Sequence, residues 1–203
     1  MTAPAIVIAA GGDGERIGGA KPLRLLAGRR LLDHAIAMAT AQSDCCAIAA
    51  REVAQIGTVP LPVLHDAWPG AGPINALASA FRFAADQGRR HVLLIGCDQP
   101  FLPRDLAQRL SAAIGQHTAA IPVSAGRYQP MAALWQADAP ALEAYAAQGG
   151  RSLWRFAEQR GAVHVPWLAA EAVDPFTNIN DPEALAAAER RLPDREASST
   201  QRS

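Results

Sequence analysis

The sequence predicts an α/β fold built around a mostly parallel β-sheet. Short runs of apolar and β-branched residues alternate along the chain with segments whose apolar residues follow a helical period. This alternation is typical of β-α-β units, in which a crossover helix brings the chain back for the next parallel strand. Seven strands are expected, at residues 5–9, 46–50, 59–64, 91–96, 118–122, 131–135 and 163–165.

Helices are expected between these strands, where apolar residues recur on one helical face. Three such faces are formed by residues 31, 32, 35, 36 and 39, by residues 74, 77, 78 and 81, and by residues 102, 106, 110 and 114. Proline is favoured in the first turn of a helix. Four prolines therefore predict helix starts, at Pro73, Pro103, Pro140 and Pro182. Asp181 is predicted to cap the last of these helices.

Composition limits the possible classes of protein. The chain has 203 residues, of which half are apolar, and its 19 basic residues balance 19 acidic ones. This balance gives no reason to expect a nucleic acid or a membrane surface as partner. No apolar stretch approaches the roughly 18 residues of a membrane span, and the first four residues lack the charged start of a secretion signal. We therefore expect a cytoplasmic protein whose three cysteines are reduced thiols.

A chain of this length is expected to form one domain, which would bury about 70% of its unfolded surface. Residues 1–192 are predicted to make up this domain. Residues 193–203 are rich in Ser, Arg and Glu and are predicted to form a disordered tail.

A glycine-rich segment, AAGGDGERIGGAKPL, follows the first predicted strand and holds Arg16 and Lys21 among five glycines. Glycines allow backbone amides to approach a ligand closely, and with nearby cations they form a nest for an anion. The spacing fits neither G-x-G-x-x-G nor a Walker A loop. The segment is predicted to bind phosphate; the alternative is a flexible connection with surface charges.

A single carboxylate, Asp98, follows the buried run at residues 91–96. Ligands of open parallel sheets bind beyond the carboxyl ends of the strands, where Asp98 would lie. Mg²⁺ commonly takes one or two carboxylates together with substrate phosphates, so one aspartate suffices. The alternative for Asp98 is a turn or cap residue. Cys97 is expected to be a small core residue.

A third segment, HDAWPGAGPI, leads through glycines into the helix that Pro73 is predicted to start. The free amides of that helix start favour an anion. Asp66 is then placed to orient a ribose or base. The five histidines lack metal-ligand spacing and are expected to have ordinary structural roles.

Five segments in order make the chain similar to the molybdenum cofactor guanylyltransferases. They are AAGGDGERIGGAK ending at Lys21, GP at Gly72-Pro73, CDQPFLP from Cys97, GRYQP from Gly126 and FTNINDPE from Phe176. The resemblance extends over nearly the whole chain. It implies a nucleotidyltransferase domain, similar in fold to GT-A glycosyltransferases. This is a three-layer α/β/α sandwich whose Rossmann-like sheet is mostly parallel with some antiparallel strands.

The resemblance also implies roles for single residues. Backbone groups of Ala9, Ala10, Gly11 and Gly12 would hold the nucleotide. Arg16 and Lys21 would bind its phosphates, Asp66 would contact the nucleotide, and Asp98 would bind both nucleotide and magnesium. Arg127, Asn178 and Asn180 would lie near the acceptor or the metal-phosphate cluster. From the residues alone, Asn178 and Asn180 also fit an Asx-turn before Pro182.

The implied reaction transfers GMP from GTP to the phosphate of molybdopterin and releases pyrophosphate, with Arg16, Lys21 and Asp98 as catalytic residues and Mg²⁺ as cofactor. The resemblance also implies transient contact with cofactor insertion proteins or molybdoenzymes. Three alternatives stay open: a cytidylyltransferase for the same cofactor, a sugar-phosphate nucleotidyltransferase, and a non-catalytic nucleotide-binding adaptor.

The sequence departs from the family pattern at three places. Ala49, Ala50 and Arg51 stand where asparagine is common, Gln129 where histidine is common, and Asn75 where residues are small. Asn75 is expected to replace a missing polar contact.

Overall fold

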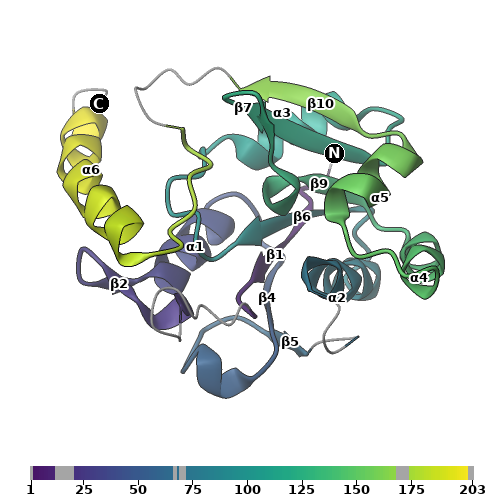
Figure 1. The fold of residues 1–203 in the computed structure, drawn as a ribbon, viewed down its shortest axis with the longest axis horizontal. Coiled ribbons are helices and arrows are strands. Elements are labelled where there is room, and N and C mark those ends of the chain that lie inside the picture. The colour runs from purple at the N-terminus through teal and green to yellow at the C-terminus, as the bar shows by residue number, and fades with distance from the viewer. Residues whose placement is uncertain (1, 12–20, 66–67, 69–71, 168–173, 201–203) are drawn as a thin grey trace.

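A mixed β-sheet forms the centre of the molecule (Figure 1). The structure, a computed structural model, describes residues 2–11, 21–65, 68, 72–167 and 174–200. Its strands follow the order β10-β7-β9-β6-β1-β4-β5, and β8 pairs with β7. Their bounds are β1 Ala5–Ala9, β4 Cys46–Ala50, β5 Val63–His65, β6 His91–Gly96, β7 Ala119–Ser124, β8 Arg127–Tyr128, β9 Leu134–Gln136 and β10 Val163–Trp167.

The sheet is parallel except around β9 and β8. β1 pairs in parallel with β4 and β6, β4 with β5, and β10 with β7. β9 lies antiparallel between β6 and β7, and β8 forms an antiparallel hairpin with β7. The predicted mostly parallel sheet with some antiparallel strands is therefore confirmed.

Helices cover both faces of this sheet. They are α1 Leu31–Thr40, α2 Pro73–Asp86, α3 Leu106–Ile114, α4 Ala139–Ala147, α5 Leu153–Arg160 and α6 Pro182–Thr200. Side chains of β1 alternate between two cores: Ile6 and Ile8 pack with α1 and α3, while Ala5 and Val7 pack with α2 and α5. This period of two is what a strand buried on both faces requires. The predicted three-layer α/β/α arrangement is confirmed.

A third, smaller core attaches the start of α6. A short hairpin, β2 (Leu25–Leu26) with β3 (Arg29–Arg30), lies beside this helix (Figure 1). Leu26 of the hairpin packs with Phe101, Ile179 and Ala188. The boundary predicted after residue 192 falls within the range of α6 and stays a prediction. Within the described ranges, no helix has both the length and the apolar character needed to cross a membrane.

Three element predictions need correction. The third helix starts at Leu106 and not near Leu102 and Pro103, because residues 97–105 form successive turns; Leu102 is buried in the same core without being helical. The strand predicted at 59–64 is shorter and shifted, at Val63–His65. The strand predicted at 131–135 begins later, at Leu134, since Pro130–Ala132 forms a 3-10 turn.

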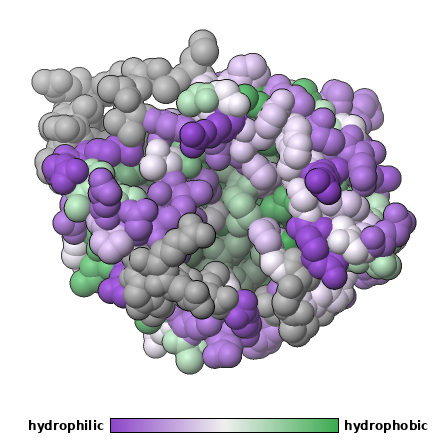
Figure 2. All heavy atoms as spheres, viewed as in Figure 1, coloured by the Kyte–Doolittle hydropathy of each residue, from purple (hydrophilic) through white to green (hydrophobic). Residues whose placement is uncertain are grey.

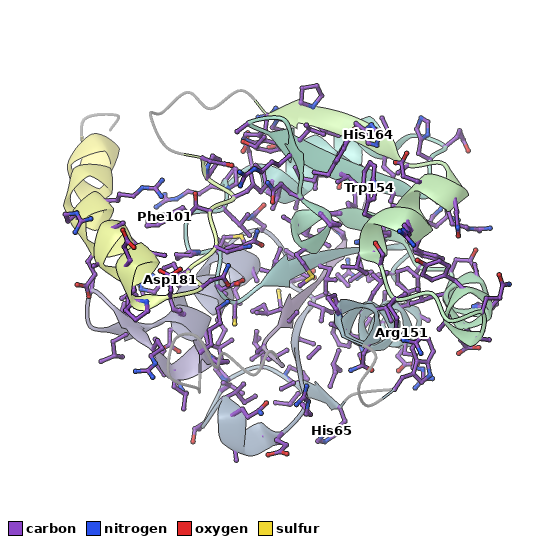
Figure 3. All side chains as sticks on the ribbon, in the orientation of Figure 1. His65, Phe101, Arg151, Trp154, His164 and Asp181 are labelled. Atoms are coloured by element: carbon purple, nitrogen blue, oxygen red, sulfur yellow. The ribbon has the colours of Figure 1, made fainter. Side chains whose placement is uncertain are left out.

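The predicted start of α6 is confirmed in detail. Pro182 is its first residue, and the side chain of Asp181 accepts a hydrogen bond from the backbone N–H of Ala184 (2.8 Å). Figure 3 shows Asp181 at this helix end. The bond satisfies one of the amides that a helix start leaves without a partner.

Replacing this cap should weaken the attachment of α6. We expect Asp181→Ala to lower the free energy of unfolding by about 1 kcal/mol, measured by urea denaturation, because a helix amide loses its acceptor. Asp181→Asn is the matched control, since asparagine caps equally well. An alanine variant as stable as the asparagine variant would contradict the assigned cap.

Candidate active site

The carboxyl ends of three neighbouring strands form the floor of a pocket. Ala9 of β1 is in register with Ala49 of β4 on one side and with Gly96 of β6 on the other. All three residues line a cavity of about 320 Å³. Figure 2 shows this face hollowed near its centre, with apolar residues in its depth. Because these residues have small side chains or none, the strand ends leave space for a small-molecule ligand.

Backbone hydrogen bonds extend this floor beyond the strands. Ala10 N–H donates to the carbonyl of Ala49 (2.8 Å), and Cys97 N–H donates to the carbonyl of Ala9 (3.1 Å). A Cβ added to Gly96 would meet the carboxylate of Asp98, so this position has no room for a side chain. Gly96 thus leaves the space that the Asp98 carboxylate occupies beside the floor of the pocket.

A lysine and an aspartate meet at one end of the pocket. Lys21, in the 3-10 turn η2 (Lys21–Leu23), donates from Nζ to Asp98 Oδ2 and to Asn180 Oδ1, both at 2.6 Å. The side chains of Lys21 and Asp98 are only 13% and 19% exposed. Charges in such a partly closed site are screened less than charges on an open surface. Three segments distant in sequence thus place two oxygens around one ammonium group.

Asn180 reaches this site because its segment is fastened to the end of β6. The carbonyl of Asp98 accepts the N–H of Ile179 (2.9 Å). Gln99, only 2% exposed, accepts the N–H of Gly96 (3.3 Å) and donates to the carbonyl of Phe176 (3.4 Å). Asp98 and Gln99 therefore position the Asn180 segment with main-chain and buried side-chain contacts.

The structure brings together several of the predicted residues. Ala9, Ala10, Gly11, Lys21 and Asp98 all line the pocket. The Asx-turn alternative does not describe Asn180, whose side-chain oxygen is bonded to Lys21. The nucleotide, metal and catalytic roles assigned to these residues stay predictions.

Other predicted residues lie elsewhere or cannot be placed. Gly12, Arg16 and Asp66 lie outside the described residues. Arg127 is exposed on β8 and is not among the residues that line the pocket. Asn178 is exposed and, within the described residues, its side chain makes no hydrogen bond.

The pocket also contains residues that the sequence analysis did not include among the catalytic or nucleotide-binding residues. Arg51 and Asn75 were singled out as departures from the family pattern, and both line the cavity. Pro22 and Met131 line it as well. No sequence signal could have found these two, because an apolar residue in a pocket wall looks like any core residue.

The Cys97 thiol, which lines the pocket, is not an activated nucleophile. Burial raises the pKa of the Cys97 thiol to about 12, and the neighbouring Asp98 carboxylate adds to this rise. The prediction that Cys97 is a small core residue is consistent with its 5% exposure. Histidines are scattered, with His65 and His164 on opposite sides of the molecule (Figure 3). Among the described residues, no three His, Cys, Asp or Glu side chains form a metal-binding group.

The native thiols should therefore react slowly with alkylating reagents. All three cysteines are buried, and burial raises the pKa of Cys46 to about 11 as well. At about pH 8 we expect Cys97 of the native protein to stay unlabelled by iodoacetamide, because the thiolate is the reactive form, while urea-unfolded protein labels fully. Peptide mass spectrometry gives the site. Fast labelling of native Cys97 near neutral pH would show that its surroundings are wrongly described.

Comparisons with known proteins identify the family of this chain. Residues 6–165 match the MobA-like NTP transferase domain. The chain is 41% identical to a molybdenum cofactor guanylyltransferase of Acidiphilium cryptum, over 90% of this chain and 92% of that protein. It is 38% identical to a molybdenum cofactor guanylyltransferase of Rhodobacter capsulatus, over 92% and 95% of the two chains.

A solved structure shows the same fold. The molybdopterin-guanine dinucleotide biosynthesis protein A of Archaeoglobus fulgidus superposes with a TM-score of 0.78, covering 94% of this chain and 99% of its own, at 22% identity. The matching domain and the two relatives each extend over most of the described elements. The chain therefore belongs to the family of MobA-like NTP transferases that includes the molybdenum cofactor guanylyltransferases.

Proposed function

We propose that this protein transfers GMP from GTP to the terminal phosphate of molybdopterin and releases pyrophosphate. The observation that carries the proposal is the Lys21 ammonium, held at the pocket end by Asp98 and Asn180. A cation at the carboxyl end of a parallel sheet, beside a floor of small residues, suits a nucleoside triphosphate. The relatives' name, molybdenum cofactor guanylyltransferase, supports a guanine nucleotide as donor and the pterin cofactor as acceptor.

Lys21 is proposed to bind the β- and γ-phosphates of GTP, which leave as pyrophosphate. It is the only lysine among the 19 Lys and Arg residues of the chain. An ammonium is a compact charge with three donors, whereas guanidinium is a broad planar group. With Asp98 and Asn180 each 2.6 Å away, the ammonium is fixed before substrate arrives. A preorganised cation stabilises charge that develops on pyrophosphate without the cost of reorientation.

Asp98 and Asn180 fit a magnesium site. Both present hard oxygen atoms to the same cation, Lys21, so these oxygens already form a site for positive charge. Mg²⁺ prefers such oxygens and takes its remaining ligands from water and phosphate. When bound, Mg²⁺ would neutralise phosphate charge as a Lewis acid. In this proposal Asp98 and Asn180 would hold the ion, and Lys21 would bind the phosphates beside it.

The transfer needs alignment more than acid-base catalysis. An oxygen of the acceptor phosphate bonds to the α-phosphorus, the bond to the bridging oxygen breaks, and pyrophosphate leaves with that electron pair. The attacking group is already an anion and needs no base. Accordingly, no histidine is among the residues that line the pocket within the described chain. The chain contributes by orienting the two anions and by reducing their repulsion.

Several roles complete the proposal. Backbone groups of Ala9, Ala10 and Gly11 would hold the nucleotide above the strand ends. Gly12, Arg16 and Asp66 are proposed nucleotide contacts, and Arg127 and Asn178 are proposed contacts on the acceptor side. Transient contact with insertion proteins or molybdoenzymes, and a cytoplasmic location, also stay proposals.

The substrate assignment is tested by a panel of nucleotides. The purified full-length protein is incubated with Mg²⁺, molybdopterin and GTP, CTP, ATP or UTP, and product masses are recorded. We expect a guanine dinucleotide and pyrophosphate from GTP alone. A cytosine dinucleotide from CTP would instead identify a cytidylyltransferase. Nucleotide binding without any product would identify an adaptor.

The role of Lys21 is tested by substitution. We expect Lys21→Ala to lower kcat/KM about 100- to 1,000-fold, the usual cost of losing one preorganised donor, with an unchanged circular dichroism spectrum. Lys21→Arg should not restore activity. The two oxygens each lie 2.6 Å from the lysine nitrogen, and the broad planar guanidinium group does not fit in the place of this compact ammonium. The control is Arg29→Ala, which removes an exposed cation that does not line the pocket. An alanine variant as active as this control would remove Lys21 from the mechanism.

A further inference from the structure

Asn75 is a buried amide in the wall of the pocket. It lies in the first turn of α2, after Gly72 and Pro73, and is only 4% exposed. It also lines the cavity. A buried polar side chain normally has hydrogen-bond partners for its donors and acceptors. The partners of Asn75 therefore indicate what this amide does.

One end of the amide is already bonded. The backbone N–H of Trp68 donates to Asn75 Oδ1 at 2.7 Å. A backbone N–H can only donate, so the atom that it meets is the oxygen, and the other end of the amide carries two N–H donors. Within the described residues, Asn75 Nδ2 makes no hydrogen bond. The wall of the pocket thus contains an oriented donor group that has no partner among the residues the structure describes.

This donor lies away from the Lys21 end of the pocket. Lys21 and Asp98 meet at the end of β6, whereas Asn75 is bonded to the connection between β5 and α2. In the sheet order β6-β1-β4-β5, the strand that precedes Asp98 and the strand that precedes Trp68 lie on opposite sides of β1. If the triphosphate lies against Lys21, the nucleoside extends toward β4, β5 and Asn75.

We propose that Asn75 is a specificity-determining residue whose Nδ2 donates to the ring carbonyl oxygen of guanine. This inference rests on the proposed function, because it requires a nucleotide in this pocket. Adenine carries an amine in place of that carbonyl, so two donors would face each other and neither would be satisfied. Sites built to hydrogen-bond one substrate group discriminate strongly against an analogue that leaves the site's donor unpaired.

The first test changes only the ligand. Dissociation constants with Mg²⁺ are measured by calorimetry on the full-length wild-type protein for GTP, inosine triphosphate, and the triphosphate of 2,6-diaminopurine. Inosine keeps the carbonyl and loses the 2-amine, whereas diaminopurine keeps the 2-amine and loses the carbonyl. We expect diaminopurine to bind about tenfold or more weakly than inosine. Equal or tighter binding of diaminopurine would overturn the inference.

The second test changes the amide. Asn75→Asp keeps an oxygen for the Trp68 N–H and replaces the donor with an acceptor. The added negative charge weakens the binding of all triphosphates alike. The readout is therefore the ratio of the ATP to the GTP dissociation constant. We expect this ratio to fall about tenfold. Ser79→Ala is the matched control: Ser79, also on α2, donates to the carbonyl of His65 (3.1 Å) at the end of β5, but does not line the pocket. Its ratio should equal that of the wild type.

The outcomes separate this inference from the proposed function. If the wild type prefers GTP but Asn75→Asp leaves the ratio of the ATP to the GTP dissociation constant unchanged, the proposed function stands and Asn75 has no part in base selection. Absence of nucleotide binding by the wild type would overturn both. If Asn75→Asp does not fold, the ligand comparison on the wild type decides.

Discussion

The bond of one ammonium group to two side-chain oxygens is the interaction on which this site depends. Lys21 joins Asp98, 77 residues away, and Asn180, 159 residues away. No local element could bring these three together, so their geometry is a property of the folded sheet. Because the side chains of Lys21 and Asp98 are mostly buried, their charges are screened less than charges on an open surface.

The rest of the fold supplies the conditions for that contact. β1, β4 and β6 are parallel and end in register, which puts the segments that follow them on one edge of the sheet. Small residues at those ends leave the pocket open. The turns after β6 then serve two purposes: Asp98 faces Lys21 with its side chain and binds Ile179 with its carbonyl. Gln99 adds a buried attachment for the same C-terminal segment. The proposed substrate chemistry and the attachment of the C-terminal segment thus rest on the same few residues.

The parts of the fold that the sequence could predict are those with strong local signals. β1, β4 and β6 are continuous apolar runs and occur at the predicted residues. The predicted start of α3 was wrong because Leu102 is buried without being helical. Helical spacing of an apolar residue does not show whether it belongs to the helix or to a buried turn before it. The antiparallel insertion of β9 depends on strand pairing across the sheet, which no local pattern encodes.

In the candidate site, too, local sequence signals predicted some features, whereas others depend on tertiary packing. Asp98 was predicted to lie beyond the carboxyl ends of the parallel strands because it follows a buried strand. The contact of Lys21 with Asn180 could not be derived from spacing, since it depends on how residues 176–180 pack against β6. Asn75 appeared in the sequence only as a departure from the family pattern. Its bond to Trp68, which gives the amide an orientation, is a tertiary fact.

The central claim is that Lys21 and Asp98 face one triphosphate in this pocket. It is tested most directly by a crystal structure with a non-hydrolysable GTP analogue and Mn²⁺, whose anomalous signal locates the metal. The account predicts Mn²⁺ at about 2 Å from an Asp98 carboxylate oxygen, with Lys21 Nζ on a β- or γ-phosphate oxygen and the base toward Asn75. A nucleotide bound elsewhere, or a metal held without Asp98, would contradict it.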